Sequence, residues 1–314
     1  MDEFGPTRPT LRQLQYFVAV AEHGAFGVAA DLLAVAQPSL SRQLAAMEAE
    51  LAITLFERTS RRVKLTPAGE DLLPRARYIL QQIREFQAAA RGATGMFGNR
   101  LSLGVLPSIG AYFMPAVNHL LHELYQELQL YVEEGSTTQL LTMLKDGRLD
   151  AVVATPNNER AFSSADLFKE TLWVCAASDD PISHRGGPVS LRELSDSPLL
   201  SLRSGFRLAT IVERLAELAG TYVRRDYQGV SLDAVRQMAI MGTGVAVLPS
   251  LYALSEAVRD PKFVVRRIDH PEAVHPIALL WRSKSPHEAD CLQLAEHLMT
   301  AERRFQEDQP DHFR

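Results

Sequence analysis

Residues 36–51 read AQPSLSRQLAAMEAEL, and this stretch combines two patterns that an ordinary core helix does not combine. Its large apolar residues recur at intervals of four, three and four: Leu40, Leu44, Met47 and Leu51. That spacing predicts a helix with one buried face. Its first turn instead carries side chains that donate and accept hydrogen bonds: Gln37, Ser39, Ser41, Arg42 and Gln43. Pro38 suits this turn, where a missing N–H leaves no helical bond unmade. We therefore expect a helix that packs by one face and presents its polar start to a partner.

The segments around this helix predict a small DNA-binding domain. Thr10 is suited to cap a first helix that Gly24 ends, and a short helix follows at about residues 25–33. After residue 51, two short extended segments flank a polar, basic turn, which is typical of a hairpin or wing. The wing's basic residues are Arg58, Arg61, Arg62 and Lys64.

A polar first turn alone fits a solvated helix start as well as a DNA-reading helix. The order of the elements decides between these two interpretations. Two helices, a third helix with a polar start and a basic hairpin are the order of a winged helix-turn-helix. In that class the third helix reads base edges in the DNA major groove, and the wing contacts the adjacent backbone.

A longer helix follows, with Thr66 as its cap and Pro67 in its first turn. Its apolar residues repeat at heptad spacing: Leu72, Ala76, Ile79, Ile83, Phe86 and Ala90. The repeat fits a helix lying on its own domain, or a two-helix coiled coil. Its position before the Gly-rich stretch RGATGMFG at residues 91–98 favours a dimerisation linker. Pro74 removes a helical hydrogen bond, so regular helix is expected to begin only near Arg75.

Beyond residue 98 the pattern changes to alternating strands and helices, which predicts an α/β fold with a parallel sheet. In a first unit, strands are expected at 100–107, 128–134 and 149–155, with helices at Met114–Tyr125 and Thr138–Lys145. In a second unit, strands are expected at 172–178, 198–202, 223–228 and 244–249, with helices at Phe206–Leu218 and Leu232–Met241. A strand at 275–283 and a helix at Pro286–Arg303 close the chain.

These patterns divide the chain into a DNA-binding domain, a linker and a sensor. We expect the winged helix-turn-helix at 1–66, the linker helix and hinge at 67–97, the effector-binding domain at 98–306 and a tail at 307–314. Within the sensor, subdomain I is expected at 98–167 and 275–306, and subdomain II at 168–274.

Polar residues collect at the strand-to-helix junctions of both α/β units. Ligands of open α/β sheets lie at the carboxyl ends of strands, close to helix N-termini. The residues there are Ser108, Ser136, Thr137, Thr138, Arg203, Ser204, Arg207 and Ser231, with Phe206 beside Arg207. Each hydroxyl on its own also fits a helix cap. Together, hydroxyls, free N–H groups and arginines form an anion trap, so we expect a small anionic effector in a cleft between the units.

Composition excludes several classes of protein. The 314 residues are 46% hydrophobic and 23% charged, as in soluble globular chains of two or three domains. No apolar run approaches the roughly 20 residues that span a bilayer, and no signal peptide is evident, so we expect a cytoplasmic protein without membrane contact. The net charge is +2 in residues 1–100 and −7 in residues 101–314. Contact with nucleic acid must therefore come from a local basic patch.

Motifs for catalysis or cofactor binding are missing from the sequence. It contains no HExxH, GxSxG or GxxxxGK[ST] motif and no metal-spaced Cys/His cluster, so we expect no cofactor and no metal. The sequence therefore contains no catalytic motif that would favour an enzyme fused to a DNA-binding module. Cys175 and Cys291 lie in apolar surroundings and are expected to be buried thiols. A regulator that responds to oxidants, or to protein contacts without a small ligand, remains an alternative.

The ordered motifs resemble the LysR-type transcriptional regulators. They are LRQLQYFVAVAEHG at 11–24, AADLL at 29–33, AQPSLSRQLAAMEAEL at 36–51 and LFERTSRRVKLTPAGE at 55–70. The resemblance implies a winged helix-turn-helix followed by a periplasmic-binding-protein-like pair of α/β subdomains. It also implies a homo-oligomer that binds double-stranded DNA, a dimer through the linker helix and a tetramer through the sensors, with RNA polymerase as a further partner.

By the same resemblance, the turn at 37–42 contacts bases and phosphates, and Arg61 and Arg62 belong to the wing. One departure is the pair Ala25 and Gly27, where such proteins usually have Ser or Thr. The second helix is therefore expected to lack a hydroxyl cap worth about 1 kcal/mol.

The second half resembles the OxyR-like peroxide sensors of that family. The matching pieces are LPSIGAYFMP at 106–115, TTQLLTMLKDGRLD at 137–150, LLSLRSGFRLA at 199–209 and SLDAVRQMAIMGTGVAVLPSLYA at 231–253. In such sensors a reactive cysteine lies in the segment matching SGFRLA. Here Arg207 occupies that place, and Phe206 stands where a His commonly precedes it. No cysteine lies between 176 and 290, which excludes thiol-based sensing at this segment. An arginine there suits a carboxylate, phosphate or sulfonate.

Overall fold

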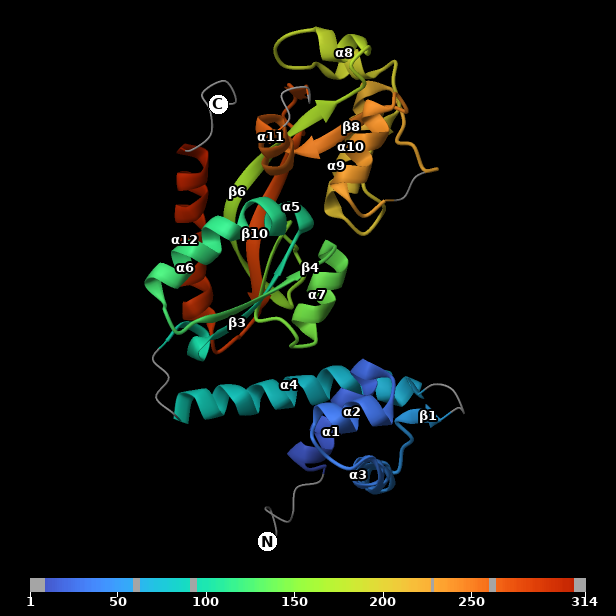
Figure 1. Cartoon of the computed structure of the whole chain (residues 1–314), viewed down its shortest axis with the longest axis vertical. Coiled ribbons are helices and arrows are strands. Elements are labelled where there is room, and N and C mark those ends of the chain that lie inside the picture. Colours follow the sequence, from blue (N-terminus) through green and yellow to red (C-terminus); the bar gives the residue numbers. More distant parts are fainter. Residues whose placement is uncertain (1–8, 59–62, 91–94, 227–228, 260–263, 308–314) are drawn as a thin grey trace. The chain divides into compact units, whose positions relative to one another are not determined.

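The computed structural model describes residues 9–58, 63–90, 95–226, 229–259 and 264–307, which form two compact units (Figure 1). The first unit contains three short helices, a hairpin and a long helix. These are α1 (Leu11–His23), α2 (Phe26–Leu32), α3 (Gln37–Leu51), β1 (Phe56–Arg58), β2 (Val63–Leu65) and α4 (Pro67–Ala90). β1 and β2 pair antiparallel, so the predicted hairpin is present; its turn at 59–62 lies outside the described residues.

Local capping explains where the first helices begin and end. The Thr10 hydroxyl accepts a hydrogen bond from the Gln13 N–H, and the Gln13 side chain accepts one from the Thr10 N–H at 2.8 Å. This reciprocal pair satisfies two backbone donors at the start of α1. Gly24 ends the helix with φ of 63°, the left-handed region that glycine adopts without strain. Ala25 precedes α2 without a side-chain cap, as expected from its missing hydroxyl.

The long helix α4 begins earlier than the proline pattern predicted. The Thr66 hydroxyl accepts from the Gly69 N–H at 3.0 Å and donates to the carbonyl of Thr54 at 2.6 Å. The helix then continues through Pro74, so a start near Arg75 is wrong. The physical reason lies in the packing of the helix. Its residues Leu73, Ala76 and Leu80 are buried in the core of the first unit, where they hold the helix across the missing hydrogen bond.

A mixed sheet forms the centre of the second unit. In chain order its strands are β3 (Arg100–Val105), β4 (Gln129–Glu134), β5 (Ala151–Ala154), β6 (Phe162–Cys175), β7 (Leu199–Leu200), β8 (Val245–Pro249), β9 (Val265–Arg267) and β10 (Val274–Arg282). Their order across the sheet is β4-β3-β5-β10-β6-β8-β7, and β9 pairs with β6. The β3–β4, β3–β5 and β7–β8 pairs are parallel, as predicted from the alternation of strands and helices. β10 is antiparallel to β5 and β6.

Helices cover this sheet in two separate groups. Those of the first group are α5 (Pro107–Tyr112), α6 (Met114–Leu124), α7 (Thr137–Lys145) and α12 (Glu288–Glu307), preceded by the short turn η1 (Met96–Asn99). Those of the second are α8 (Pro181–His184), η2 (Leu191–Leu194), α9 (Arg207–Ala219), α10 (Leu232–Ile240) and α11 (Ser250–Arg259). We call β3–β5 with the first group lobe I, and β7–β9 with the second group lobe II. Each lobe has its own apolar core, and the strands β6 and β10 run through both (Figure 1).

One predicted strand is not formed. Residues 223–228 were expected to be extended, but among those described only Val223 makes an isolated bridge, to Leu199. The Arg224 side chain instead hydrogen-bonds Asp226 at 3.0 Å and the carbonyl of Thr243 at 2.8 Å. These bonds hold residues 224–226 in a loop. Within the described ranges, no helix has the length and apolar character needed to cross a membrane.

Candidate DNA-binding surface and effector cleft

The polar N-terminal turn of α3 is exposed, while its inner face is buried. Leu40 and Leu44 are fully buried and Met47 is 2% exposed, as the spacing predicted. In the first turn Gln37, Pro38, Arg42 and Gln43 are exposed, and Ser39 and Ser41 are half-buried. No side chain caps α3, and the N–H groups of Ser39 and Leu40 donate to the Ala36 carbonyl. This turn therefore presents amide and guanidinium side chains together on one surface.

Two contacts hold α3 in position. The Gln13 side chain of α1 donates to the carbonyl of Gln43 at 3.3 Å. At the other end, one Glu48 oxygen accepts from the N–H groups of Leu55 and Phe56, at 2.7 and 3.2 Å. The helix is thereby fixed both to α1 and to the start of the hairpin. Rigid attachment of this kind lets a helix enter a groove with a defined register.

The wing is described only in part. Lys64 is exposed on β2, and Arg58 ends β1, although the Arg58 side chain lies outside the described residues. Arg61 and Arg62 also lie outside them. Their roles therefore stay predictions.

A cleft of about 550 Å³ lies between lobe I and lobe II. Lobe I contributes Ser108 and Ser136, which are 5% and 4% exposed. Lobe II contributes Arg203 and Ser231 from its loops and Phe206 from the start of α9. Five of the nine residues predicted for the effector site therefore line one cavity. Its volume is within the range of small-molecule binding sites.

The other four predicted residues lie outside the lining of this cleft. Thr138 closes one edge, because its hydroxyl donates across to the carbonyl of Gly205 at 3.4 Å. Thr137 has a buried hydroxyl oxygen without a hydrogen-bond partner among the described residues. Ser204 is exposed. Arg207 is also exposed and borders a second, smaller cavity that lies between the lobes.

The smaller cavity has a volume of about 20 Å³, enough for roughly one water molecule. It is lined by Ser108, Phe206 and Arg207, and also by His275 of β10. His275 is 2% exposed; its ring nitrogens lie 3.0 Å from a Glu170 oxygen and 2.9 Å from the Thr155 hydroxyl. The pair Glu170–His275 thus links β6 to β10, the two strands that the lobes share.

Sequence reasoning missed several groups that line the cleft. They are Tyr112, Glu134, Gln139, Asp233 and Tyr252. The Tyr112 hydroxyl of α5 donates to Glu256 of α11 at 2.9 Å. Tyr252 likewise donates to Asp233 at 2.7 Å. The only sequence signal for these groups was proximity to predicted site residues. Tyr112 lies four residues after Ser108, and Asp233 lies two residues after Ser231.

Burial raises the pKa of Tyr112 and of Tyr252 well above the usual tyrosine range, and their carboxylate partners raise it further. Both hydroxyls therefore stay protonated near neutral pH and act as hydrogen-bond donors. The rings pack edge to face with centroids 5.5 Å apart. Because Tyr112 belongs to lobe I and its partners to lobe II, this cluster joins the lobes at the wall of the cleft.

The two cysteines are not arranged for redox chemistry. Cys175 and Cys291 are 1% and 0% exposed, and neither forms a disulfide. Burial raises the pKa of each thiol to about 12. At neutral pH both are protonated, whereas the thiolate is the reactive form.

The arrangement defines a class of protein: a winged helix-turn-helix joined to a two-lobed α/β domain with a ligand-sized cleft. Comparison with known proteins agrees with this. Residues 11–70 match the bacterial regulatory helix-turn-helix protein, lysR family, and residues 95–303 match the LysR substrate binding domain. The chain belongs to the LysR family of DNA-binding transcriptional regulators.

Its similar relatives include activators of hydrogen peroxide-inducible genes. The chain is 34% identical to such an activator from Dickeya chrysanthemi over 91% of its own length and 93% of the relative. It is equally identical, with the same coverage, to the DNA-binding transcriptional dual regulator OxyR of Escherichia coli.

Among solved structures, a cysteine-to-aspartate variant of full-length OxyR from Pseudomonas aeruginosa is 30% identical, with a TM-score of 0.76 and coverage of 93% of this chain and 95% of that one. CbnR, a LysR family regulator of 24% identity, shares the fold with a TM-score of 0.68 over 93% of this chain and 99% of that one.

Proposed function

We propose that the affinity of this regulator for its DNA sites depends on a small effector, with an anionic group, that binds in the cleft between lobe I and lobe II. The observation that carries the proposal is the composition of the cleft wall. Arg203 is the cation that lines it within the described residues, and Ser108, Ser136 and Ser231 line it from both lobes. A guanidinium with several hydroxyls suits a carboxylate, phosphate or sulfonate.

The carboxylates near the cleft leave Arg203 available. Asp233 accepts a hydrogen bond from Tyr252 and lies 4.0 Å from Arg236, so part of its charge is compensated. Glu134 is exposed and lies over Gly110 on lobe I. Arg203 itself has no ion-pair partner in the part of the chain that the structure describes. The favourable place for an anion is therefore the lobe II side of the cleft.

Binding in the cleft would act on DNA through the arrangement of the lobes. An effector that contacts both lobes stabilises one of their arrangements, provided that it binds this arrangement better than the other. In a dimer formed through α4, and a tetramer formed through the sensors, such a change alters how pairs of α3 helices are presented to two DNA half-sites. By linkage, DNA binding then changes the affinity for the effector by the same factor.

Thermal unfolding of the full-length protein with a panel of small carboxylates, phosphates and sulfonates tests the proposal. At a hundred times its dissociation constant, a specific ligand stabilises the folded state by about 2.7 kcal/mol. We expect Arg203→Gln to abolish the shift of the unfolding midpoint. Arg207→Gln tests the sequence-based assignment, since Arg207 borders only the smaller cavity. If no member of the panel shifts the midpoint, or if the shift persists in both variants, the anionic site is misplaced.

Hydrogen peroxide is a second candidate signal, favoured by the names of the relatives. Direct sensing by a thiol is nevertheless disfavoured in this chain. Arg207 stands in the segment where the resemblance implies a cysteine, and both cysteines that the chain has are buried and protonated. A peroxide response would therefore require other chemistry than thiolate oxidation.

A further inference from the structure

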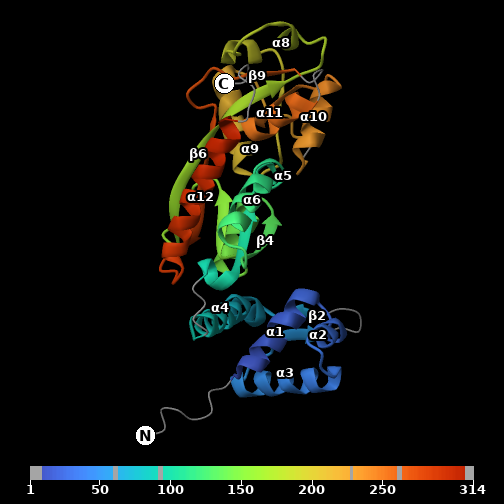
Figure 2. The same ribbon diagram turned by 60° about the vertical axis from the view of Figure 1, so that its left-hand side comes forward.

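A second large pocket lies apart from the effector cleft and shares no lining residue with it. It has a volume of about 610 Å³ and is formed by β6, the start of α11, β9 and the C-terminal end of α12. Figure 2 shows α12 running alongside β6. The volume is sufficient for a small organic molecule.

The wall of this pocket is partly aromatic and apolar. Trp173 and Phe168 contribute from β6, Phe305 from α12, and Leu254 from α11. The Trp173 indole N–H donates to the Thr171 hydroxyl at 2.9 Å, which fixes the ring on the strand. A ring held in this way contributes a flat aromatic surface to the wall of the pocket.

Three cations line the pocket: Lys169 and Arg267 beside Trp173, and Arg303 on α12. Lys169 lies on β6, four residues before Trp173 and on the same face of the strand. Arg267 of β9 pairs directly with Trp173 across the two strands. Both side chains are exposed, and neither has a hydrogen bond or ion pair within the described residues. Within the described residues, these two positive charges beside the apolar surface therefore have no ion-pair partner.

Three acids also line the pocket: Glu170, Glu302 and Glu307. Glu170 contacts His275 and accepts from the Leu251 N–H at 3.2 Å. Glu302 accepts a hydrogen bond from Gln306, and burial raises the pKa of its carboxyl. The charged side chains next to Trp173 on its face of the strands are those of Lys169 and Arg267.

The pocket is connected to the region between the lobes. Glu170 lines the pocket, and the His275 ring that it contacts lines the small cavity between lobe I and lobe II. A ligand in the pocket would therefore lie against one member of the pair that links β6 to β10.

We propose that this pocket is a second ligand site, which binds an organic anion with a flat apolar body. The apolar body packs on Trp173 and Phe305, and the anionic group lies between Lys169 and Arg267. The site is separate from the effector cleft, because the two cavities share no lining residue.

Calorimetric titration of the full-length protein with 2-naphthoate tests the proposal, and tryptophan fluorescence locates the site. The chain has two tryptophans: Trp173 in the pocket, and Trp281, which is 2% exposed in the core of lobe I. We expect saturable binding that quenches Trp173. The quenching should persist in Trp281→Phe and disappear in Trp173→Phe. The Trp281→Phe variant retains only the pocket tryptophan. If Trp173→Phe does not fold, quenching of the Trp281→Phe variant still reports binding in the pocket.

Charge variants test how the anion is held. Lys169→Gln and Arg267→Gln should each weaken binding about tenfold, equivalent to about 1.4 kcal/mol. The matched control is Arg304→Gln, which removes an exposed charge from the same end of α12 outside the pocket. The neutral analogue naphthalene-2-carboxamide should bind more weakly than 2-naphthoate by a similar factor.

Several results would overturn the proposal. One is the absence of saturable binding up to millimolar 2-naphthoate. Another is equal binding of the neutral amide, or unchanged affinity in both charge variants. Weaker binding in Arg203→Gln, with Lys169→Gln unaffected, would place the probe in the effector cleft instead.

Discussion

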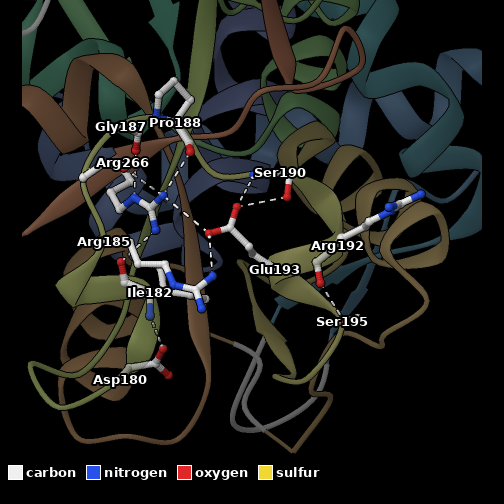
Figure 3. A network of polar contacts seen from close by, with 11 residues as sticks. Asp180, Ile182, Arg185, Gly187, Pro188, Ser190, Arg192, Glu193, Ser195 and Arg266 are labelled. Carbon is white, nitrogen blue, oxygen red and sulfur yellow. Dashed lines mark hydrogen bonds and ion pairs between the residues drawn. The ribbon is translucent and has the colours of Figure 1, made fainter.

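At the scale of single residues, buried charges in this protein are placed where several groups satisfy them. Arg266 of β9 is 6% exposed, and Figure 3 shows its guanidinium facing the carbonyls of the loop that follows α8. It donates to Ile182, Gly187 and Pro188 at 3.0, 2.8 and 2.9 Å. Glu193 lies 3.6 Å away, and hydrogen bonds from Ser190 lower the pKa of its carboxyl. One side chain thus organises this end of lobe II.

Replacing Arg266 with methionine should destabilise the protein. The three carbonyls lose a charged donor, and this costs roughly 3 kcal/mol in the free energy of unfolding. Urea unfolding followed by tryptophan fluorescence measures the change. The matched control is Arg185→Met, which removes only an exposed ion pair with the same Glu193 and should cost less than about 1 kcal/mol. Equal losses in the two variants would contradict this role for Arg266.

The buried thiols make a second prediction at this scale. Since burial raises the pKa of Cys175 and Cys291 to about 12, hydrogen peroxide should not convert either to a sulfenic acid in the native protein. Dimedone labelling followed by mass spectrometry measures that product. Protein unfolded in urea is the positive control and should be labelled. Rapid labelling of the native protein would contradict this prediction and would support thiol-based sensing.

At the scale of helices and strands, sequence patterns were most informative where the contacts are local. The spacing of Leu40, Leu44 and Met47 identified the buried face of α3, and Thr10 and Thr66 identified two helix starts. Sequence patterns failed where tertiary packing decides where a helix or strand begins and ends. Pro74 was expected to delay α4, but burial of the neighbouring apolar residues holds the helix across it.

The candidate site was predictable only in part, for the same physical reason. Ser108 and Ser136 were found because hydroxyls at helix starts have a local signature. The contact between Tyr112 and Glu256 joins residues 144 positions apart, and no local sequence pattern predicts it. The segment at 223–228 resembled a strand, yet the Arg224 side chain bonds Asp226 and Thr243, and the described residues 224–226 form a loop.

The exposed apolar face of α4 predicts a dimer. Ile79 and Phe86 are 43% and 70% exposed although they belong to the heptad repeat, which fits burial against a second copy of the helix. Phe86→Glu should therefore weaken the dimer by at least tenfold, since burying a Phe side chain contributes about 1.5–3 kcal/mol. Analytical ultracentrifugation measures the dissociation constant. The control is Gln87→Glu, which adds the same charge at the next residue, outside the heptad repeat. It should leave the dissociation constant of the dimer nearly unchanged. An unaltered dimer in Phe86→Glu would exclude this interface.

At the scale of the whole molecule, the two-lobed unit is arranged so that its lobes can communicate. β6 and β10 run through both lobes, the Tyr112 hydroxyl joins α5 to α11, and Thr138 contacts Gly205 across the cleft edge. Any change in the arrangement of the lobes must alter these contacts. They are therefore the place where effector binding and lobe movement are coupled.

Tyr112→Phe tests this coupling. The variant loses one hydrogen bond between the lobes and should be destabilised by about 1 kcal/mol. It should also change the affinity for any cleft ligand found by thermal unfolding. Tyr125→Phe is the control, since the Tyr125 hydroxyl contacts His297 within lobe I at 2.8 Å and should affect stability alone. An identical ligand affinity in both variants would show that the Tyr112 contact has no part in coupling.

The most direct test of the account is whether the first turn of α3 reads DNA. The full-length protein would first select duplexes from a random pool. Fluorescence anisotropy at one salt concentration would then give dissociation constants for a selected duplex and a scrambled one. We predict that Arg42→Ala weakens binding to the selected duplex by about 1–3 kcal/mol, and to the scrambled duplex by clearly less. Equal losses on both duplexes, or none on either, would contradict the assignment of α3 as the recognition helix.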